Sequence, residues 1–434
     1  MNPADTAITH FDVAIVGGGP AGLSTAVALA LRGVSSVIVE KKSWPIDKVC
    51  GEGLMPTGVA VLERLGVLDH LAKDMLRPFH GIRYIDASGI QAEGRFPHEP
   101  GLGIRRVGLS RALYDRALSL QKVSFWDNTT VRHLSTTDEY AELAVKRNGQ
   151  EQALRARVVI GADGLHSRVR QWANLTAPAP TKQKRWGTRQ HFQIKPWTDH
   201  VEVYWRAGFE AYVTPSSENR LQIAFLWDRD QFHPKAGKSD IIQAFLGHFP
   251  ELAKKLQGAI PEARPRGIGP LAHAATAAHT DRILLMGDAL GYVDGITGEG
   301  VAVALQQAET IAEHLPQLLQ RDTLHTEGLS ELGHALREVY KEGFCMIEPA
   351  LLLTRHPTLR QMAIRGLSRS PGLFTHILAS NMGLVSPFLP PLAELPKFLF
   401  GVASPKTESH CLPVWPTQKR SKQSVHASGA SGPA

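Results

Sequence analysis

The sequence is poor in cysteine. The chain has only three cysteines among 434 residues, Cys50, Cys345 and Cys411, and they are far apart. So few thiols at such spacing predict neither a disulfide framework nor a metal cluster, and we expect no bound metal. A chain without a disulfide framework suits the reducing cytoplasm, where we expect it to act. No secretory leader is expected, because a short polar segment precedes the first apolar strand.

A long uninterrupted apolar run is also missing. Residues 382–403 are apolar, but prolines interrupt them too often for a transmembrane helix, so we expect no transmembrane segment. We expect this segment to pack on the body of the protein, and peripheral membrane contact stays open as the alternative.

Charge of one sign is only slightly in excess. The formal net charge is +7, and the last 30 residues contribute four basic residues against one acidic residue. That tail is rich in Ser, Pro, Gly and Gln, a composition typical of disorder. No basic stripe interleaved with aromatic residues is present, so no nucleic-acid partner is expected.

The most informative segment lies near the start of the chain. Residues 12–40 have the pattern of an apolar strand, a glycine-rich turn (17–22), a helix and a second apolar strand that ends in Glu40. A helix that begins at such a turn offers free N–H groups and a partial positive charge to phosphates. Glu40 lies 18 residues past Gly22, near the spacing of a carboxylate that binds ribose hydroxyls. The pattern predicts a dinucleotide site.

The glycines of this turn have separate roles. Gly17 permits the tight turn, Gly19 lets the backbone approach a pyrophosphate, and Gly22 lets helix and strand pack closely. We expect the cofactor to contact the turn and the end of the second strand, at Gly17, Gly19, Pro20, Ala21, Gly22, Glu40 and Lys41.

Two later strands end in motifs that point to the same site. Residues 158–162 lead into Asp163-Gly164, and residues 282–286 lead into Gly287-Asp288. With the glycine-rich turn, and in this order, these motifs resemble the flavoprotein monooxygenase superfamily of the para-hydroxybenzoate hydroxylase fold. The resemblance covers nearly all of residues 11–320. It implies that the dinucleotide is FAD and that NAD(P)H is a transient electron donor.

The resemblance also implies how the flavin end of FAD is held. Asp288, after Gly287, would accept hydrogen bonds from the ribityl hydroxyls. The helix that begins near Gly298 and Gly300 would direct its N-terminus at the isoalloxazine ring and favour the negative charge of reduced flavin.

Two other segments are expected near the middle of FAD. The Asp163-Gly164 turn would pass close to the pyrophosphate and shape the entry for the nicotinamide. Arg106 stands where the family places an arginine that contacts FAD, and Arg111 is the alternative if the register differs.

We therefore expect an α/β fold: a Rossmann-like FAD-binding domain with an inserted antiparallel β-sheet substrate domain and a C-terminal helical region. Period-two alternation between about 181 and 270 predicts the antiparallel sheet. Apolar spacing predicts helices over 56–76 and 109–121, a long helix is expected over 300–319, and residues 330–380 look helical with proline breaks. The expected division assigns 1–77, 99–180 and 271–320 to the FAD-binding domain, 78–98 and 181–270 to the substrate sheet, 321–404 to the helical region and 405–434 to a disordered tail.

A loop around Cys50 indicates which branch of the superfamily the chain resembles. Residues 48–56 resemble the Cys-Gly-rich loop of geranylgeranyl-reductase-like flavoproteins and the corresponding Gly-Glu loop of flavin-dependent halogenases. In the family this loop runs beside the flavin, where residues without side chains let the backbone approach a flat ring. Cys50 is either a site residue or a small buried thiol that fills a gap.

The stretch 210–215 departs from the halogenase pattern. Halogenases carry Trp-x-Trp-x-Ile-Pro there, and Glu210 and Tyr212 replace both tryptophans, which argues against a halogenase. Prenyl reductases carry aromatic-x-aromatic-x-Phe-Pro. Tyr212 and Pro215 fit that pattern, whereas Glu210 and Thr214 do not.

The sequence names no catalytic residue. His191, His273 and His279 have no motif around them, and we interpret them as surface or satisfied core residues. Aromatic residues of the alternating strands either line a substrate pocket or pack in the core: Trp186, Trp205, Tyr212, Phe225 and Trp227.

The activity that the resemblance implies is NAD(P)H-dependent monooxygenation of a small or medium aromatic or apolar substrate through a flavin C4a-hydroperoxide, as in secondary metabolism. The partner is a small-molecule substrate. The first alternative is an FAD-dependent reductase of C=C bonds in a prenyl or polyketide substrate. The second is a flavoprotein maturation factor without turnover of its own. Neither the substrate nor the oligomeric state can be read from these patterns.

Overall fold

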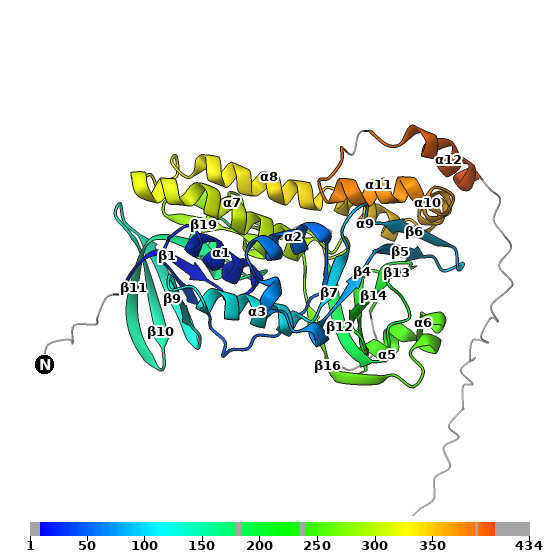
Figure 1. The fold of residues 1–434 in the computed structure, drawn as a ribbon, viewed down its shortest axis with the longest axis horizontal. Coiled ribbons are helices and arrows are strands. Elements are labelled where there is room, and N and C mark those ends of the chain that lie inside the picture. The colour runs from blue at the N-terminus through cyan, green and yellow to red at the C-terminus, as the bar shows by residue number, and fades with distance from the viewer. Residues whose placement is uncertain (1–8, 179–183, 234–239, 387–388, 404–434) are drawn as a thin grey trace, which may run out of the picture. The chain divides into compact units, whose positions relative to one another are not determined.

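The fold is that of a computed structural model, which describes residues 9–178, 184–233, 240–386 and 389–403 (Figure 1). The predicted tail, 405–434, lies outside the described residues.

The first of two large sheets contains the strands predicted around the glycine-rich turn. Its strands are β1 (Thr9–Val16), β2 (Ser36–Val39), β8 (Val123–Trp126), β9 (Thr129–Thr136), β10 (Ala141–Arg147), β11 (Gln150–Gly161), β18 (His279–Thr280) and β19 (Ile283–Leu285). The main path has the order β18-β19-β11-β1-β2-β8, and β1 pairs in parallel with both β11 and β2. All four residues of β2 are buried, as expected for a parallel strand covered on both faces.

Helices pack on this sheet through a continuous apolar core. They are α1 (Pro20–Ala30), α2 (Pro56–Arg64), α3 (Arg106–Leu118), α7 (Gly300–Arg321) and α8 (Ser330–Phe344). The central helix, α1, contacts α3 and α7, and α7 contacts α8. Ile15 and Val159 of the sheet share one fully buried cluster with Leu23 of α1 and Leu305 of α7.

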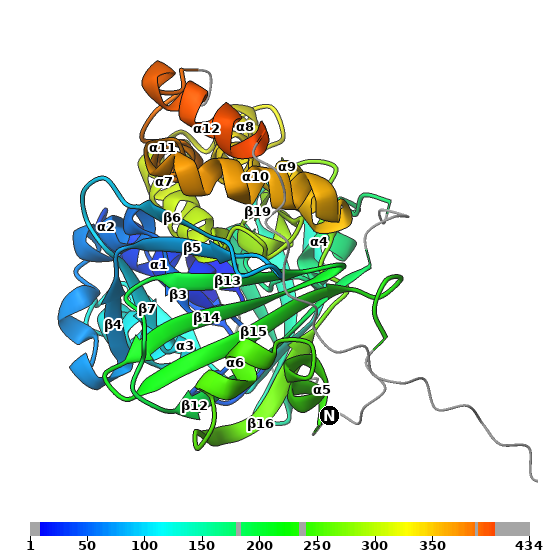
Figure 2. The same cartoon turned by 90° about the vertical axis from the view of Figure 1, so that its right-hand side faces the viewer.

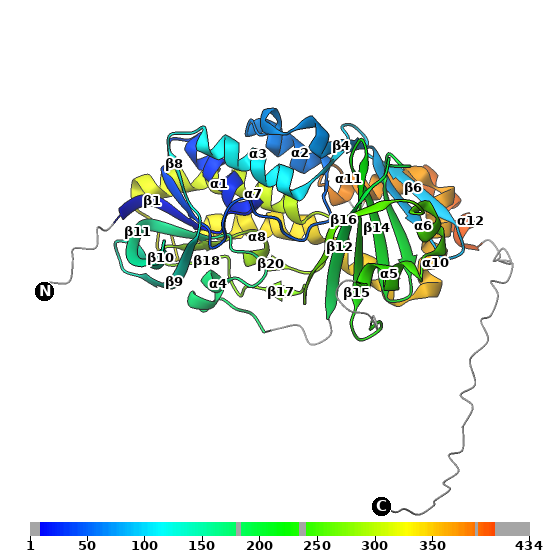
Figure 3. The same cartoon turned by 90° about the horizontal axis from the view of Figure 1, so that it is seen from below.

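The second sheet combines two segments that are far apart in sequence. Its strands are β5 (Gly81–Ile85), β6 (Gln91–Arg95), β12 (Arg185–Gln193), β13 (Val201–Arg206), β14 (Phe209–Ser217), β15 (Arg220–Asp228) and β16 (Ile260–Ile268). The order is β16-β12-β15-β14-β13-β5-β6, and every pair is antiparallel except β13 with β5. Figures 1 and 3 show the two sheets side by side. The strands of 78–98 and of 181–270 thus share one sheet, and the division of the chain into FAD-binding and substrate-sheet segments stays a prediction.

Both faces of the second sheet are covered (Figure 2). Two short helices that the sequence did not predict, α5 (Ile241–Leu246) and α6 (Pro250–Lys255), close one face, where Phe245 packs on Phe225. The other face meets the C-terminal helices, where Phe374 packs on Tyr84. These helices are α9 (Ile347–Arg355), α10 (Pro357–Arg369), α11 (Pro371–Asn381) and α12 (Leu395–Ala403).

Prolines punctuate the C-terminal helices as predicted. Pro357 and Pro371 each occupy the first turn of a helix, where a missing N–H is harmless. Among the residues that the structure describes, no helix combines the length and apolar composition needed to cross a bilayer.

The helix predicted over 56–76 is shorter than expected. The α2 helix ends at Arg64, and Gly66 follows with a φ of +67°, a left-handed conformation that stops a helix. Beyond it the chain forms two 3₁₀ turns, Leu68–His70 and Lys73–Met75. Leu65 and Leu68 therefore keep the three-residue spacing of a helix although they lie beyond the end of α2, with a turn between them.

The remaining elements are short. They are β3 (Gly53–Leu54), β4 (Leu76–Phe79) and β7 (Gly101–Ile104), which form a small sheet, the pair β17 (His273–Ala274) and β20 (Gly291–Tyr292), and α4 (Arg168–Trp172).

Candidate functional site

The three predicted turns meet at one large cavity. Its volume is about 1100 Å³, and it runs between the first sheet, the second sheet and helices α9–α11. Of the predicted cofactor-binding residues, those that line it are Gly17, Gly19, Pro20, Ala21, Glu40, Lys41, Arg106, Asp163, Gly164, Gly287, Asp288, Gly298 and Gly300. Gly22 is the exception.

Gly17 and Gly22 explain the shape of the turn. Gly17 has a φ of +113°, and a Cβ there would lie 2.4 Å from the Ala162 carbonyl oxygen of the neighbouring strand. A Cβ on Gly22 would lie 2.0 Å from the Gly17 carbonyl oxygen. No larger residue fits either position without a backbone shift. Gly22 thus lies on the packing side of the turn, as its predicted role requires, and not on the cavity side.

Two cations face the turn at Gly19. The space beside its Cα is open, and its nearest neighbours are Lys48 Nζ and Arg106 Nη2, 3.8 and 3.9 Å from where a Cβ would stand. Lys48 Nζ also lies 3.8 Å from the corresponding point on Gly164. Burial and the charge of Arg106 lower the pKa of Lys48. Two cations desolvated beside a helix N-terminus fit a diphosphate, because the anion would stabilise both.

Glu40 lies at the other side of this turn. Its carboxylate accepts the Gly18 N–H at 2.8 Å and the Lys42 N–H at 3.0 Å, and its side chain is buried. These bonds hold the carboxylate at the cavity wall. Each oxygen retains acceptor capacity, so the group fits two ribose hydroxyls.

Asp163 has a structural contact that the motif did not reveal. One carboxylate oxygen accepts the N–H groups of Arg168 and Val169, at 2.7 and 3.2 Å, and so caps the start of α4. The other oxygen is buried and has no hydrogen-bond partner among the described residues.

Arg106 and Asp288 both line the cavity. The backbone N–H of Arg106 donates to Glu52 at 2.8 Å, whereas Arg111 is exposed and lies 3.6 Å from Asp115. The structure therefore places Arg106, and not Arg111, at the cavity. Burial raises the pKa of Asp288, although Lys48 and Arg106 oppose the shift.

The N-terminus of α7 closes the flavin end of the predicted site. Thr297, Gly298 and Gly300 line the cavity, and Glu299 between them is buried and accepts a 2.7 Å hydrogen bond from Asn381 of α11. Burial raises the pKa of Glu299 to about 8, although the Asn381 bond opposes the shift. A neutral Glu299 leaves the positive end of the helix dipole undiminished.

Part of the cavity is an apolar chamber. Its walls come from strands and helices: Phe79, Ile82, Tyr84, Val201, Val203, Tyr212 and Leu226 from the sheets, and Leu353, Leu367, Phe374, Ile377 and Leu378 from the helices. Burial raises the pKa of Tyr84 to about 12, so its phenol stays neutral. Of the aromatic candidates, Tyr212 lines the cavity, while Trp205, Phe225 and Trp227 are buried in core clusters, and Phe225 stacks on Phe245 at the other face of the sheet.

The Cys50 loop runs along the cavity. Val49, Cys50, Gly51 and Gly53 line it, and Gln222 donates to the Cys50 carbonyl at 2.7 Å. Burial raises the pKa of the Cys50 thiol, which keeps it protonated. This position fits the site reading of Cys50 better than the gap-filling one.

The three histidines are held by structural contacts. His191 is buried, with one ring nitrogen 2.8 Å from Glu52 and the other 3.0 Å from Arg189. His273 and His279 contact backbone carbonyls, and burial lowers the pKa of each. None of the three is among the residues that line the cavity.

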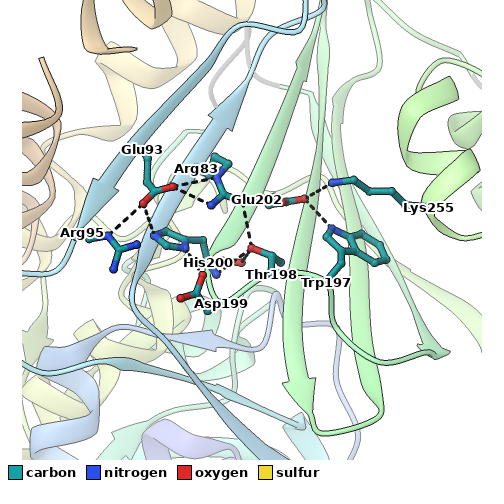
Figure 4. Close-up of polar contacts among 9 residues, drawn as sticks. All are labelled: Arg83, Glu93, Arg95, Trp197, Thr198, Asp199, His200, Glu202 and Lys255. Atoms are coloured by element: carbon teal, nitrogen blue, oxygen red, sulfur yellow. Dashed lines mark hydrogen bonds and ion pairs between the residues drawn. The ribbon is translucent and has the colours of Figure 1, made fainter. Parts of the chain in front are cut away.

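A second polar cluster lies on the sheet face opposite the cavity (Figure 4). Glu202 accepts hydrogen bonds from Arg83 at 3.0 Å, Trp197 at 3.0 Å and Lys255 at 3.3 Å, and Arg83 also pairs with Glu93 at 2.8 Å. Because strand side chains alternate, the neighbours of Arg83 and Glu202 face the chamber while this cluster does not. We interpret it as a bridge that holds β5, β6, β13 and α6 together.

Lys48 and Glu52 were missed as site residues. Both lie in the loop that the resemblance singled out, and a basic residue two positions before the cysteine was the available signal for Lys48. Glu52 gave no signal, because its partners Arg106 and His191 are distant in sequence.

Comparison with known proteins identifies the family. The family model described as an FAD binding domain matches residues 10–326. Digeranylgeranylglycerophospholipid reductase 3 of Methanosphaera stadtmanae is 26% identical, over 69% of this chain and 75% of its own length. Para-nitrophenol 4-monooxygenase of Pseudomonas sp. is 28% identical, over 76% of this chain and 83% of its own.

The fold has solved counterparts. Halogenase PltM in complex with phloroglucinol and FAD matches with a TM-score of 0.70 and 15% identity, over 85% of this chain and 82% of that chain. At this identity the match speaks for the fold alone. The family match and the relatives agree: the chain belongs to the FAD binding domain family, and it is an FAD-dependent oxidoreductase of the flavoprotein monooxygenase superfamily, with geranylgeranyl-reductase-like proteins among its relatives.

Proposed function

We propose that this protein is an NAD(P)H-dependent monooxygenase that hydroxylates a small or medium aromatic or apolar substrate. The observation that carries the proposal is the continuous cavity, which joins the dinucleotide turns to an apolar chamber. FAD, when bound, supplies the chemistry: it takes electrons from NAD(P)H and activates oxygen.

The residues of the chain would bind and orient FAD. Lys48 and Arg106 would hold its diphosphate against the N-terminus of α1, and Glu40 would accept the ribose hydroxyls. Asp288 would accept the ribityl hydroxyls, and the N–H groups at the start of α7 would favour negative charge on the ring.

The apolar chamber would bind the substrate and exclude water. Its wall has few polar side chains: Tyr84, Tyr212 and Asn381 are among them, and Tyr212 already donates to the Ile296 carbonyl at 3.1 Å. A dry chamber suits oxygen transfer, because water would divert the activated oxygen.

Oxygen use tests the proposal. We expect the purified protein to be yellow and to oxidise NAD(P)H faster when its substrate is present, with one oxygen atom of isotopically labelled O₂ in the product. Hydroxylated product whose new oxygen comes only from water would contradict monooxygenation.

A C=C reductase is the second candidate, and the position of Cys50 favours it. Saturating a C=C bond adds a hydride and a proton, and the protonated Cys50 thiol at the cavity wall is able to give the proton. A reductase should turn over without oxygen, whereas a monooxygenase should stop. A yellow protein with tight FAD and no NAD(P)H oxidation in either atmosphere would instead match a maturation factor.

The cellular setting is part of the proposal. Cys50 and Cys345 are free thiols in the described part of the chain, as expected in a reducing compartment. We propose the cytoplasm as the place of action and a small molecule as the partner.

A further inference from the structure

A row of three side chains crosses the second sheet at the wall of the apolar chamber. Tyr84 of β5 pairs with Val203 of β13, and Val203 pairs with Tyr212 of β14. All three residues line the cavity. Residues directly opposite each other on neighbouring strands point to the same face of a sheet, and two strand spacings amount to about 10 Å. The row therefore presents two phenol groups to the chamber, with an aliphatic side chain between them.

The hydroxyl groups of the two tyrosines differ. Tyr212 donates to the Ile296 carbonyl at 3.1 Å, which ties it to the loop before α7. Tyr84 packs between Trp205 and Phe374, with ring centroids 5.3 and 4.7 Å away, and its hydroxyl has no hydrogen-bond partner among the described residues. Burial raises the pKa of Tyr84 to about 12, so its hydroxyl keeps its proton at neutral pH. A neutral phenol both donates and accepts hydrogen bonds, and leaving it without a partner in an apolar place is costly.

Charged side chains are missing from this part of the cavity. Arg83 of β5 and Glu202 of β13 alternate with cavity-lining residues and belong to the cluster on the opposite face of the sheet (Figure 4). Among the described residues that β5, β13, β14 and helices α9–α11 contribute to the cavity, none is acidic or basic. The buried ions close to Tyr212 pair with one another and do not line the cavity: Arg185, Glu210 and Asp294. An ionised group in the chamber would lose its hydration and find no counter-ion.

We propose that Tyr84 is a specificity-determining residue, whose hydroxyl binds an uncharged hydroxyl or carbonyl oxygen of the substrate, and that the chamber rejects carboxylates of the same size. This inference rests on the proposed function for the existence of a small-molecule substrate, and it adds the class of compound. The single free phenol selects for the oxygen, and the lack of a cation selects against the carboxylate.

Ligand binding to the full-length FAD-loaded protein, without NAD(P)H, tests the inference. Three probes share one two-ring scaffold: 2-naphthol is neutral at pH 7, 2-naphthoate is ionised, and naphthalene has no oxygen. Equilibrium dialysis measures the affinity of each probe. We expect 2-naphthol to bind about tenfold more tightly than naphthalene, the worth of one hydrogen bond. The carboxylate 2-naphthoate should bind at least about a hundredfold more weakly than 2-naphthol, because its charge is buried without a partner.

Two matched variants locate the selectivity. Tyr84→Phe removes the hydroxyl and keeps the ring that packs on Phe374, so 2-naphthol should bind within about twofold of naphthalene, and naphthalene should bind as it does to the wild type. Tyr140→Phe removes a hydroxyl from a tyrosine outside the cavity lining, with Arg155 over its ring, and should bind all three probes like the wild type. Retained flavin absorbance checks the folding of each variant.

Three results would overturn the inference: equal binding of 2-naphthol and 2-naphthoate, no binding of any probe, or an undiminished preference for 2-naphthol in Tyr84→Phe. Failure of the proposed function would look different. A protein that shows the expected binding preferences but oxidises no NAD(P)H with any neutral substrate would refute monooxygenation and support the role of Tyr84 in binding.

Discussion

Arg185 donates a hydrogen bond to Glu210 across 2.7 Å, and neither side chain is more than 3% exposed. Arg185 also bonds to Asp294 at 2.8 Å, and Thr354 of α9 donates to Glu210 at 2.6 Å. Although burial opposes the charge, Glu210 and Asp294 raise the pKa of Arg185. This ion cluster joins the second sheet to the loop before α7 and to the helical wall of the chamber. It also explains why Glu210 stands where halogenases carry tryptophan.

Arg185→Gln should destabilise the protein strongly. The substitution removes the cation that faces both Glu210 and Asp294, and breaking a buried ion cluster in this way typically costs about 3–5 kcal/mol. We expect a loss of about 3 kcal/mol in the free energy of unfolding, measured by urea titration.

The exposed pair Arg111 and Asp115 supplies the control. These side chains are 77% and 43% exposed and lie 3.6 Å apart, so Asp115→Asn should change stability by about 0.5 kcal/mol or less. Similar small losses in both variants would show that the buried cluster contributes no more to stability than an exposed ion pair.

Local patterns were enough to predict the parallel strands and the cofactor turns. In the buried strand β2, the run Val37–Val39 is continuously apolar, as expected where both faces are covered. Gly17 has a φ of +113°, and a Cβ on Gly22 would meet the Gly17 carbonyl oxygen of the same turn, so the spacing of these glycines carries the geometry of the turn directly. For such residues the physical constraint is local and visible in the sequence.

Contacts between distant segments were not predictable in this way. Glu210 looked like a departure from a motif until Arg185 and Asp294 were seen beside it. Lys48 faces Gly19 and Gly164 only because three loops converge. A pattern within one sequence does not predict these contacts between distant residues, because they depend on how the two sheets pack together.

Asp288→Ala should separate cofactor binding from stability. Losing a carboxylate that accepts ribityl hydroxyls should weaken FAD binding by about tenfold to a hundredfold, as expected for hydrogen bonds to a charged group. The free protein should not lose stability, because the variant removes a carboxyl group whose pKa burial already raises. Flavin absorbance of the purified protein and thermal unfolding of the FAD-free form measure the two effects.

The exposed Asp69 gives a control of the same chemistry. Asp69→Ala should purify with the flavin content of the wild type. If the Asp288→Ala protein has as much bound flavin as the wild type, Asp288 does not contact the cofactor.

Glu40→Ala should weaken binding of FAD by about tenfold but leave FMN binding within about twofold. Only FAD has the adenosine ribose whose hydroxyls we assign to this carboxylate. The comparison also controls for the turn, since Glu40 accepts the Gly18 and Lys42 N–H groups, and a turn disturbed by their loss would weaken the binding of both flavins. Fluorescence titration of the FAD-free protein with each flavin measures both affinities, and an equal fall for FAD and FMN would refute the ribose contact.

Glu299 should make stability fall as pH rises. Burial raises its pKa to about 8 in the folded protein, against an ordinary value of 4.5. Between these values the folded chain holds a proton that the unfolded chain has released. Unfolding is therefore favoured by raising the pH through this window, at up to about 1.4 kcal/mol per pH unit, and the effect levels off above the folded pKa.

Glu299→Gln isolates this effect, because the amide cannot ionise and still accepts the Asn381 hydrogen bond. We expect the variant to gain stability relative to the wild type steadily from pH 5 to pH 7, by urea unfolding of the FAD-free protein. Glu331→Gln, at an exposed carboxylate in the first turn of α8, should show no such gain. A Glu299→Gln difference that stays constant with pH would mean that Glu299 is ionised at pH 7, and the N-terminus of α7 would then face the flavin beside a negative charge.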